Sequence, residues 1–396
     1  MSASESSRFP VAGLQAITNV SNEWVALLLR LQVGDAAQAD SAAATTASLS
    51  ALFASVDAIE VLDALAPLDC IITLSDPDVL TPGLLALLPA ARIIFCTSSH
   101  ACATQEGAWQ RLAGEGYRIL IDGAPDVSPA WACGWTFDAF DACATPASAC
   151  SALPGPHLAR NVDSAAHLLA WRAAGFAWAS GRYPLFPSER GSKSDGTTRK
   201  RLLVLLVLLA RDADSRELEI LIKQDPALSY HLLKLVNSAS FALGAPINSF
   251  GQAINLMGRR QLQRWLQLLL YARGPDDAAL HPLLPMAALR GAQMEALCRS
   301  GGGDLDQQDR AFMVGIFSLL DVLLQMPMQD IVGALSLRID VAMALQQRSG
   351  ALGQMLALVE SFDVTAEALM RAGVGAESWW RSLLQACQYA IVLGRN

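Results

Sequence analysis

The chain has 396 residues, of which 53% are apolar and 17% are charged. A chain of this length and apolar content buries a substantial core, is expected to form two or three domains, and is not disordered over most of its length. The net charge is −8, and residues 1–187 hold 17 acids, eight Arg and no Lys. Contacts with a nucleic-acid backbone need concentrated basic residues, so the composition argues against nucleic acid as the main partner.

The eight cysteines form no CxxC pair, and the first ten residues lack the layout of a secretory signal. We therefore expect reduced thiols and a cytoplasmic protein. The most membrane-like run, residues 202–210, is nine residues long. A spanning helix needs about 20, so no membrane association is predicted.

In residues 1–187, short apolar runs alternate with longer amphipathic stretches. The runs are 70–74, 92–96 and 118–121, and the stretches include 107–114 and 164–174. This alternation is typical of βαβ units with a parallel sheet. The Ala-, Ser- and Thr-rich segment 36–54 is compatible with a further helix.

Residues 188–200 contain Gly, Ser and charged residues but no large apolar residue, which predicts an exposed linker. From residue 201 to 396 the pattern is helical, with capping-box sequences at 214–217 and 249–252. The C-terminal half is therefore expected to be all-α. Trp379 and Trp380 near its end indicate either core packing of a terminal helix or an exposed contact patch.

The segment 225–241 predicts a helix that Asp225 caps, that has Pro226 in its first turn and that closes at Asn237 and Ser238. Asn237 is a poor residue for a helix interior. Its side chain is expected either to order the following loop through backbone hydrogen bonds or to meet a partner.

Three stretches of this half resemble the HDOD domain, an all-α relative of the HD phosphohydrolases. They are residues 225–241 with Asp225, Pro226 and Phe241, then 247–258, then 311–321. The resemblance runs from about residue 202 to residue 362. It implies a helical domain without the metal-binding residues of its relatives.

The first half resembles the EAL domain, the fold of cyclic di-GMP phosphodiesterases. The similar stretches are 15–17, 26–30, 116–123, 159–163 and 175–187, in the order of that family's motifs. The resemblance implies a (β/α) barrel. A barrel takes about 250 residues, whereas at most 187 are available, so we expect a shortened one with reduced early helices. The predicted organisation is an EAL-like domain over 1–187, a linker over 188–200 and an HDOD domain with C-terminal helices over 201–396.

Metal-assisted phosphodiester hydrolysis needs clustered carboxylates. The resemblance places the following residues at the family's ligand and catalytic positions: Ala26, Thr73, Cys96, Asp122, Gly123, Arg160 and Ser180. Asp122 alone is a carboxylate. It is expected either to end a strand or cap a helix, or to retain some metal binding. The first Lys of the chain is Lys193, so the domain also lacks the family's catalytic lysine.

The HD site is missing as well, because none of the five histidines is followed by Asp. Ser318 and Leu319 stand where the HD pair is expected, with Asp321 nearby. His281, directly before Pro282, is expected to lie at the surface or cap a helix.

The sequence therefore predicts a non-catalytic signalling adaptor without metal or cofactor. Its partners are other signalling proteins, and the resemblance suggests a link to cyclic di-GMP pathways. One alternative is a sensor that binds cyclic di-GMP without cleaving it. Arg30 would allow a phosphate contact, whereas the missing carboxylates and lysine argue against tight binding. A hydrolase of unfamiliar mechanism is a third alternative. The candidate interaction or loop-ordering residues are Asp225, Pro226, Asn237, Ser238 and Phe241.

Overall fold

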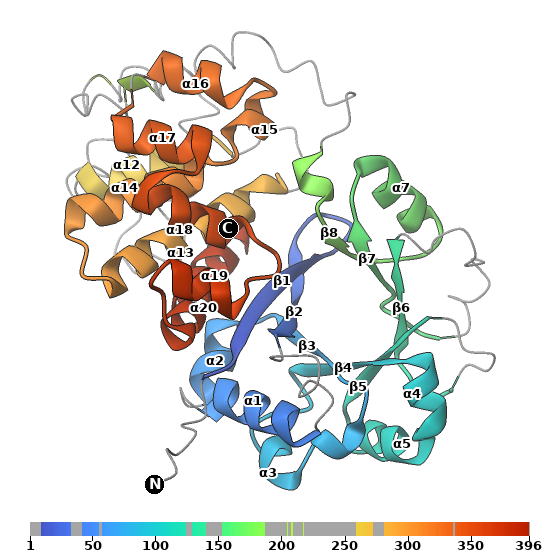
Figure 1. The fold of residues 1–396 in the computed structure, drawn as a ribbon. Coiled ribbons are helices and arrows are strands. Elements are labelled where there is room, and N and C mark those ends of the chain that lie inside the picture. The colour runs from blue at the N-terminus through green and yellow to red at the C-terminus, as the bar shows by residue number, and fades with distance from the viewer. Residues whose placement is uncertain are drawn as a thin grey trace, which may run out of the picture. The chain divides into compact units, whose positions relative to one another are not determined.

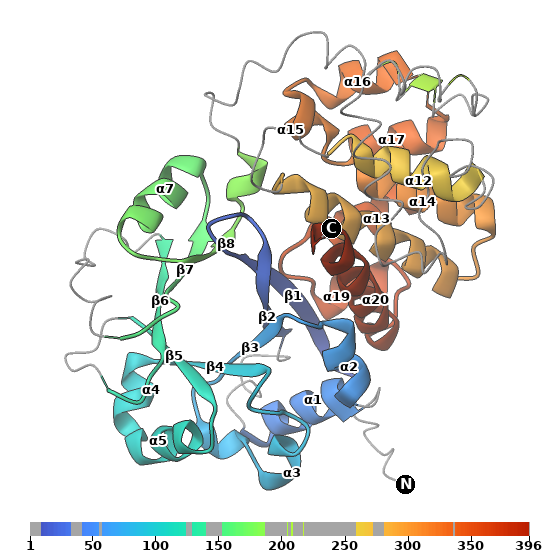
Figure 2. The same ribbon diagram turned by 180° about the vertical axis from the view of Figure 1, so that it is seen from behind.

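The computed structural model describes residues 9–32, 42–54, 58–123, 129–139, 153–186, 204, 207–208, 217, 259–271, 281–335 and 337–395. The contacts divide the chain into two compact units, which we describe separately (Figures 1 and 2). The first unit comprises Met1–Val20, Trp24–Phe186 and Ser361–Leu384, and we call it the barrel unit. The second comprises Ser21–Glu23, Pro187–Glu360 and Gln385–Asn396, and we call it the helical unit.

The barrel unit is built on a closed barrel whose strands follow one another in chain order. The strands are β1 (Val11–Thr18), β2 (Trp24–Gln32), β3 (Asp69–Thr73), β4 (Ile93–Ser98), β5 (Arg118–Asp122), β6 (Gly134–Asp138), β7 (Leu158–Val162) and β8 (Trp178–Gly181). Strand β1 runs antiparallel to β2 and β8, whereas the remaining pairs are parallel. The expected barrel and its parallel strands are therefore confirmed, with an antiparallel first hairpin that the sequence analysis did not predict.

The helices around the barrel are short. They are α1 (Ala42–Ala54), α2 (Ala58–Ala64), α3 (Pro82–Leu85), α4 (Ser99–Thr104), α5 (Glu106–Gly114) and α7 (Ala165–Ala173). Side-chain oxygens of Thr81, Ser98 and Ser164 accept backbone N–H groups at the starts of α3, α4 and α7. The helix expected within 36–54 and those expected over 107–114 and 164–174 are confirmed by α1, α5 and α7.

Side chains alternate between the two faces of the barrel wall, as they must on β-strands. One buried cluster fills the interior and consists of Ile17, Ala26, Leu28, Ile71, Ile94, Cys96, Leu120 and Leu158. Another cluster lies outside the wall and includes Ile121, Trp135, Phe137, Ala159 and Trp171. The barrel interior is therefore a packed core, and it positions polar side chains only near its ends.

No helix separates β1 from β2, because these strands form a hairpin. The C-terminal segment contributes instead. Ser361–Leu384, which contains α19 (Ala366–Arg371) and the first part of α20 (Ala376–Arg395), belongs to the barrel unit. The Trp379 indole nitrogen donates to the Ala12 carbonyl at 2.9 Å, and both Trp379 and Trp380 are buried. The core-packing interpretation of this Trp pair is confirmed, although the sequence analysis had placed the segment with the HDOD domain.

The described part of the helical unit contains only helices and connections, as expected. Its helices are α12 (Arg259–Leu269), α13 (Leu283–Ser300), α14 (Leu305–Phe317), α15 (Leu320–Leu324), α16 (Met328–Leu335), α17 (Ile339–Gln347) and α18 (Gly350–Glu360). Helices α13 and α14 approach closely, since a Cβ added at Gly315 would lie 2.6 Å from the Arg290 backbone. The side chain of Asp304 caps α14 in a capping box with Gln307. His281 Nδ1 accepts the Leu283 N–H at 3.2 Å, which confirms its capping role.

The predicted linker at 188–200 and the segment 225–241 lie outside the described residues. The structure therefore does not test the domain boundary at residue 187. Within the described residues, no helix is long and apolar enough to cross a bilayer.

Candidate functional site

The candidate site lies inside the barrel, where the parallel strands end. Active sites of (β/α) barrels lie at this C-terminal face. Here β3, β4, β5 and β7 bring Thr73, Cys96, Asp122 and Arg160 together. Cys96 is paired with Thr73 and with Leu120 across neighbouring strands, and Thr73, Asp122 and Arg160 all influence the ionisation of its thiol. The structure thus assembles positions that the sequence analysis had singled out one by one.

The residues at these positions are mostly neutral. Ala26 and Cys96 lie in the interior cluster, 0% and 2% exposed. Burial raises the pKa of the Cys96 thiol to about 12, while Arg160 and Asp122 act on it in opposite directions. Only the thiolate is a good metal ligand, so Cys96 is a poor donor at neutral pH.

The remaining carboxylate is held by an arginine. Arg160 on β7 donates from one terminal nitrogen to both oxygens of Asp122 on β5, at 2.7 and 2.6 Å. Their side chains are 23% and 31% exposed. The Arg160 guanidinium therefore occupies both carboxylate oxygens that a divalent cation would need as ligands. Within the described residues, no group of three or more His, Cys, Asp and Glu could hold a metal ion.

Two buried hydroxyl groups lie near this pair. Thr136 on β6 and Ser180 on β8 are 0% and 1% exposed, and their oxygens have no hydrogen-bond partner among the described residues. The same is true of Arg160 Nε. Buried polar atoms are normally satisfied, so this part of the interior suits ordered water or a small polar molecule.

A cavity of about 490 Å³ opens at this end of the barrel. It is lined by residues of β1, β2, β3 and β7 and by the C-terminal segment, including Gln15, Arg30, Thr73, Arg160 and Asp363. Arg30 donates to Gln15 Oε1 at 2.9 Å and pairs with the Asp363 carboxylate at 3.3 Å. We call this end, with its cavity, the mouth of the barrel.

The opposite end of the barrel carries a second ion pair, which we call the floor pair. Arg118, on the same strand as Asp122, forms two hydrogen bonds to Asp69 of β3, at 2.8 and 2.7 Å. Asp69 is 19% exposed. This arrangement uses two guanidinium nitrogens and both carboxylate oxygens, a geometry that fixes orientation as well as charge.

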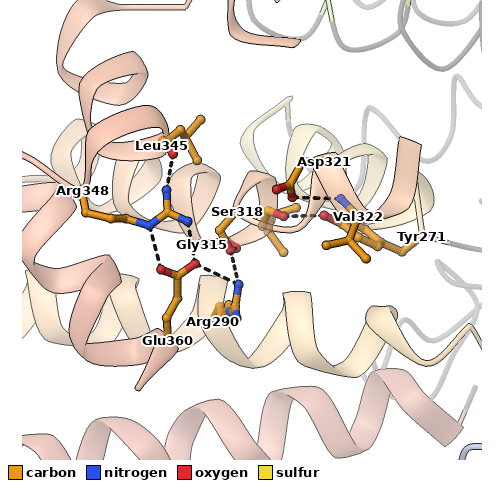
Figure 3. Close-up of polar contacts among 10 residues, drawn as sticks. Tyr271, Arg290, Gly315, Ser318, Asp321, Val322, Leu345, Arg348 and Glu360 are labelled. Atoms are coloured by element: carbon orange, nitrogen blue, oxygen red, sulfur yellow. Dashed lines mark hydrogen bonds and ion pairs between the residues drawn. The ribbon is translucent and has the colours of Figure 1, made fainter. Parts of the chain in front are cut away.

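In the helical unit, Figure 3 shows the region where the HD pair was expected. Ser318 accepts a hydrogen bond from Arg290 of α13 at 2.8 Å and donates to the Gly315 carbonyl at 2.7 Å. Arg290 also contacts Glu360 at 3.2 Å. Glu360 in turn accepts two hydrogen bonds from Arg348, at 2.7 and 2.9 Å. One carboxylate thus bridges two arginines, and we call Arg290, Glu360 and Arg348 the arginine triad.

Two neighbouring polar side chains form hydrogen bonds with the backbone. Asp321 accepts the Val322 N–H at 2.9 Å, and the Tyr271 hydroxyl donates to the Ile316 carbonyl at 2.6 Å (Figure 3). Burial lowers the pKa of Arg290 and raises that of Tyr271. Arg290 nevertheless stays charged at neutral pH because a guanidinium titrates far above it.

The candidate residues Asp225, Pro226, Asn237, Ser238 and Phe241 all lie outside the described residues. Their interaction and loop-ordering roles remain predictions. Conversely, the contacts of Asp363, Arg290 and Glu360 were not predicted from the sequence. None of them belongs to a motif, and their partners are distant in sequence, so the sequence carries no local signal for these contacts.

Comparisons with known proteins agree with this organisation. An HDOD domain model matches residues 201–340. The chain is 34% identical over 154 residues to the cyclic di-GMP phosphodiesterase CdgJ of Vibrio cholerae, covering 38% of this chain and 35% of that protein. It is 32% identical over 144 residues to the uncharacterized protein YuxH of Bacillus subtilis, covering 36% and 35%. The chain thus spans about a third of the length of the curated relatives it matches.

Solved structures similar to this chain include a PaMucR phosphodiesterase in complex with c-di-GMP, at 14% identity and a TM-score of 0.36. The similarity covers 43% of this chain and 89% of that one. Another is the EAL domain of Mycobacterium smegmatis DcpA, at 13% identity and a TM-score of 0.33, covering 43% and 90%. These similarities are low, and the strand order of this chain itself establishes the closed barrel. The chain combines a closed barrel with a region, residues 201–340, that matches the HDOD domain model.

Proposed function

We propose that this protein is a non-catalytic, cytoplasmic signal-transduction adaptor that acts through protein–protein interaction in pathways related to cyclic di-GMP. The observation that carries the proposal is the Asp122–Arg160 ion pair at the mouth of the barrel. It commits Asp122, the one carboxylate among the positions that resemble the family's ligands, to a cation that belongs to the chain itself.

The residues at the site do not fit Mg²⁺ or Mn²⁺. These ions take oxygen ligands, preferably several carboxylates. The positions that resemble the family's ligands hold Ala26, Cys96 and Arg160 beside Asp122. A methyl group, a protonated thiol and a guanidinium cannot replace carboxylates, so we derive no metal-dependent step.

The helical unit supports the same proposal. Where a metal-binding His–Asp pair would be needed, the chain has Ser318 and Leu319, and Ser318 is hydrogen-bonded to Arg290. An arginine in this place repels a divalent cation. Both units therefore retain a fold of enzyme relatives while presenting arginine–carboxylate contacts in place of metal ligands.

The link to cyclic di-GMP pathways rests on the relatives. CdgJ is named a cyclic di-GMP phosphodiesterase, and the match covers only part of either protein. We carry over the pathway and not the activity. Partners are expected among other signalling proteins, and the chain's acidic first half gives no support for nucleic acid.

A turnover assay tests the proposal. The purified chain is incubated with cyclic di-GMP and Mg²⁺ or Mn²⁺, beside an Asp122→Ala variant. We expect both to match a buffer blank. Turnover by the wild type that is lost in Asp122→Ala would overturn the proposal. A pull-down from the source cell, followed by mass spectrometry, would identify the partners.

A second candidate function is a sensor that binds cyclic di-GMP without hydrolysing it. The mouth cavity favours it, because Arg30 and Arg160 both line a space of about 490 Å³. Calorimetric titration separates the candidates. Saturable binding without turnover supports the sensor, and absence of binding supports the adaptor.

A further inference from the structure

The mouth cavity is partly lined by the chain's own C-terminal segment. Phe362, Asp363 and Val364 contribute to its wall, opposite strand residues such as Gln15 and Arg30. They follow α18 and precede α19, and they belong to the barrel unit. An adjoining cavity of about 860 Å³ shares Arg30, Phe362 and Asp363. The segment thus lies where both cavities meet.

Asp363 holds Arg30 in the way an anionic ligand would. One carboxylate oxygen lies 3.3 Å from Arg30 Nε, while Arg30 Nη1 is hydrogen-bonded to Gln15. The Arg30 and Asp363 side chains are 38% and 65% exposed. Guanidinium groups bind carboxylates and phosphates through the same N–H donors. A phosphate that binds Arg30 Nε would therefore displace Asp363.

We propose that Asp363, from the chain's own C-terminal segment, is a built-in competitor for anions of the phosphate class at Arg30. The inference rests on the second candidate function, in which the mouth binds an anion without hydrolysing it. The pair is exposed, so the contact is weak and can be exchanged. Asp363 also repels a second anion in the cavity, which adds to the competition.

The surrounding charges fit this interpretation. Arg160 faces the same cavity with its charge already balanced by Asp122. Among the contacts described for the Arg30 side chain, the one ion pair is with Asp363, and the hydrogen bond is with the neutral side chain of Gln15. Removing the charge of Asp363 leaves Arg30 as the anion-binding group without disturbing the Asp122–Arg160 pair.

The test compares Asp363→Asn with wild type in the full-length chain. Inorganic pyrophosphate and cyclic di-GMP serve as probes in separate calorimetric titrations. We expect Asp363→Asn to bind at least one probe about 1.5-fold to fivefold more tightly than wild type, the range that loss of a weak ion pair allows. The double variant Arg30→Gln/Asp363→Asn should lose that gain.

Glu115→Gln is the matched control. Glu115 is exposed at the end of α5, just before β5 begins, so it lies at the opposite end of the barrel. The variant removes one negative charge from the same unit and should leave both affinities unchanged. An equal gain in Glu115→Gln would assign the effect to net charge and overturn the proposal.

Unchanged affinities for both probes in Asp363→Asn, with an unchanged melting temperature, would also overturn it. Such a result would leave the adaptor proposal standing, because that proposal needs no ligand. Conversely, hydrolysis of bound cyclic di-GMP by wild type would refute the non-catalytic function while the competition at Arg30 could still be measured. The two failures are therefore distinguishable.

Discussion

The arginine triad and the mouth of the barrel place arginines and carboxylates together in different surroundings. In the triad, Arg290, Glu360 and Arg348 are 10%, 22% and 34% exposed, and hydrogen bonds from two arginines converge on one carboxylate. At the mouth, Arg160 and Asp122 are 23% and 31% exposed beside a cavity of about 490 Å³. The carboxylate of the triad is held by two arginines, whereas the mouth pair, Asp122 and Arg160, lies beside a cavity with room for a ligand. Loss of metal ligands therefore need not abolish a binding site.

Glu360→Gln should have the largest effect on stability. The substitution leaves Arg290 and Arg348 near each other without the carboxylate that separates their charges. Removing one partner of a partly buried ion pair leaves the other charge poorly solvated, and we expect a loss of about 2 to 3 kcal/mol in the free energy of unfolding. Denaturant titration measures it. Glu367→Gln, in an exposed Glu–Arg pair, should cost at most about 0.5 kcal/mol; equal losses would contradict the structural role of the triad.

The floor pair provides a reference within the barrel. Asp69→Asn removes one of two parallel hydrogen bonds and the charge that balances Arg118. Since Asp69 is 19% exposed, we expect a loss of about 2 kcal/mol, measured by urea unfolding. If Asp69→Asn lowers the free energy of unfolding by less than Asp122→Asn does, the floor pair stabilises the barrel less than the mouth pair.

Two buried thiols, one in each unit, should make stability depend on pH. Burial raises the pKa of Cys96, near the mouth, and of Cys387, in the helical unit, to about 12. Each thiol is protonated in the folded protein up to about pH 12, whereas in the unfolded chain it ionises near pH 9. Its contribution to stability is therefore complete below pH 9 and is lost as the pH rises toward 12. The free energy of unfolding should fall by about 1.4 kcal/mol per pH unit per thiol in this window.

Alkylation mapped by mass spectrometry checks the thiols individually. At pH 8, Cys96 and Cys387 should react more slowly than the partly exposed Cys298. Rapid modification of Cys96 in the folded protein would show that Arg160 lowers its pKa more than burial raises it.

Among the ion pairs of the triad, the floor and the mouth, Asp122→Asn should have the smallest effect. Arg160 would lose the charge of its partner but could still donate to the amide oxygen, and water can reach this part of the cavity. We expect a loss of about 1 kcal/mol in thermal or urea unfolding. If Asp122→Asn lowers the free energy of unfolding as much as Glu360→Gln does, the mouth pair is as important for stability as the triad.

Much of the barrel could be predicted because its parallel strands are short apolar runs between amphipathic stretches. The β1–β2 hairpin could not, since buried residues such as Leu27 and Leu28 occupy both faces of β2 and leave no strand alternation. The loss of ligands at Ala26 and Cys96 was evident from residue type. The pairing of Arg160 with Asp122 could not be predicted from the sequence. Strand β6 lies between their strands, and the side chains meet inside the barrel wall only once the strands are assembled.

The contribution of Ser361–Leu384 to the barrel unit has a consequence for synthesis on the ribosome. Strands β1 to β8 emerge first, yet Trp379, which binds the Ala12 carbonyl, is made only after residues 187–360. At about 5 to 20 residues per second, those 174 residues take roughly 10 to 35 seconds. During that interval the nascent barrel lacks the segment that covers its first hairpin, and a stop codon introduced after residue 360 would leave it in that state permanently.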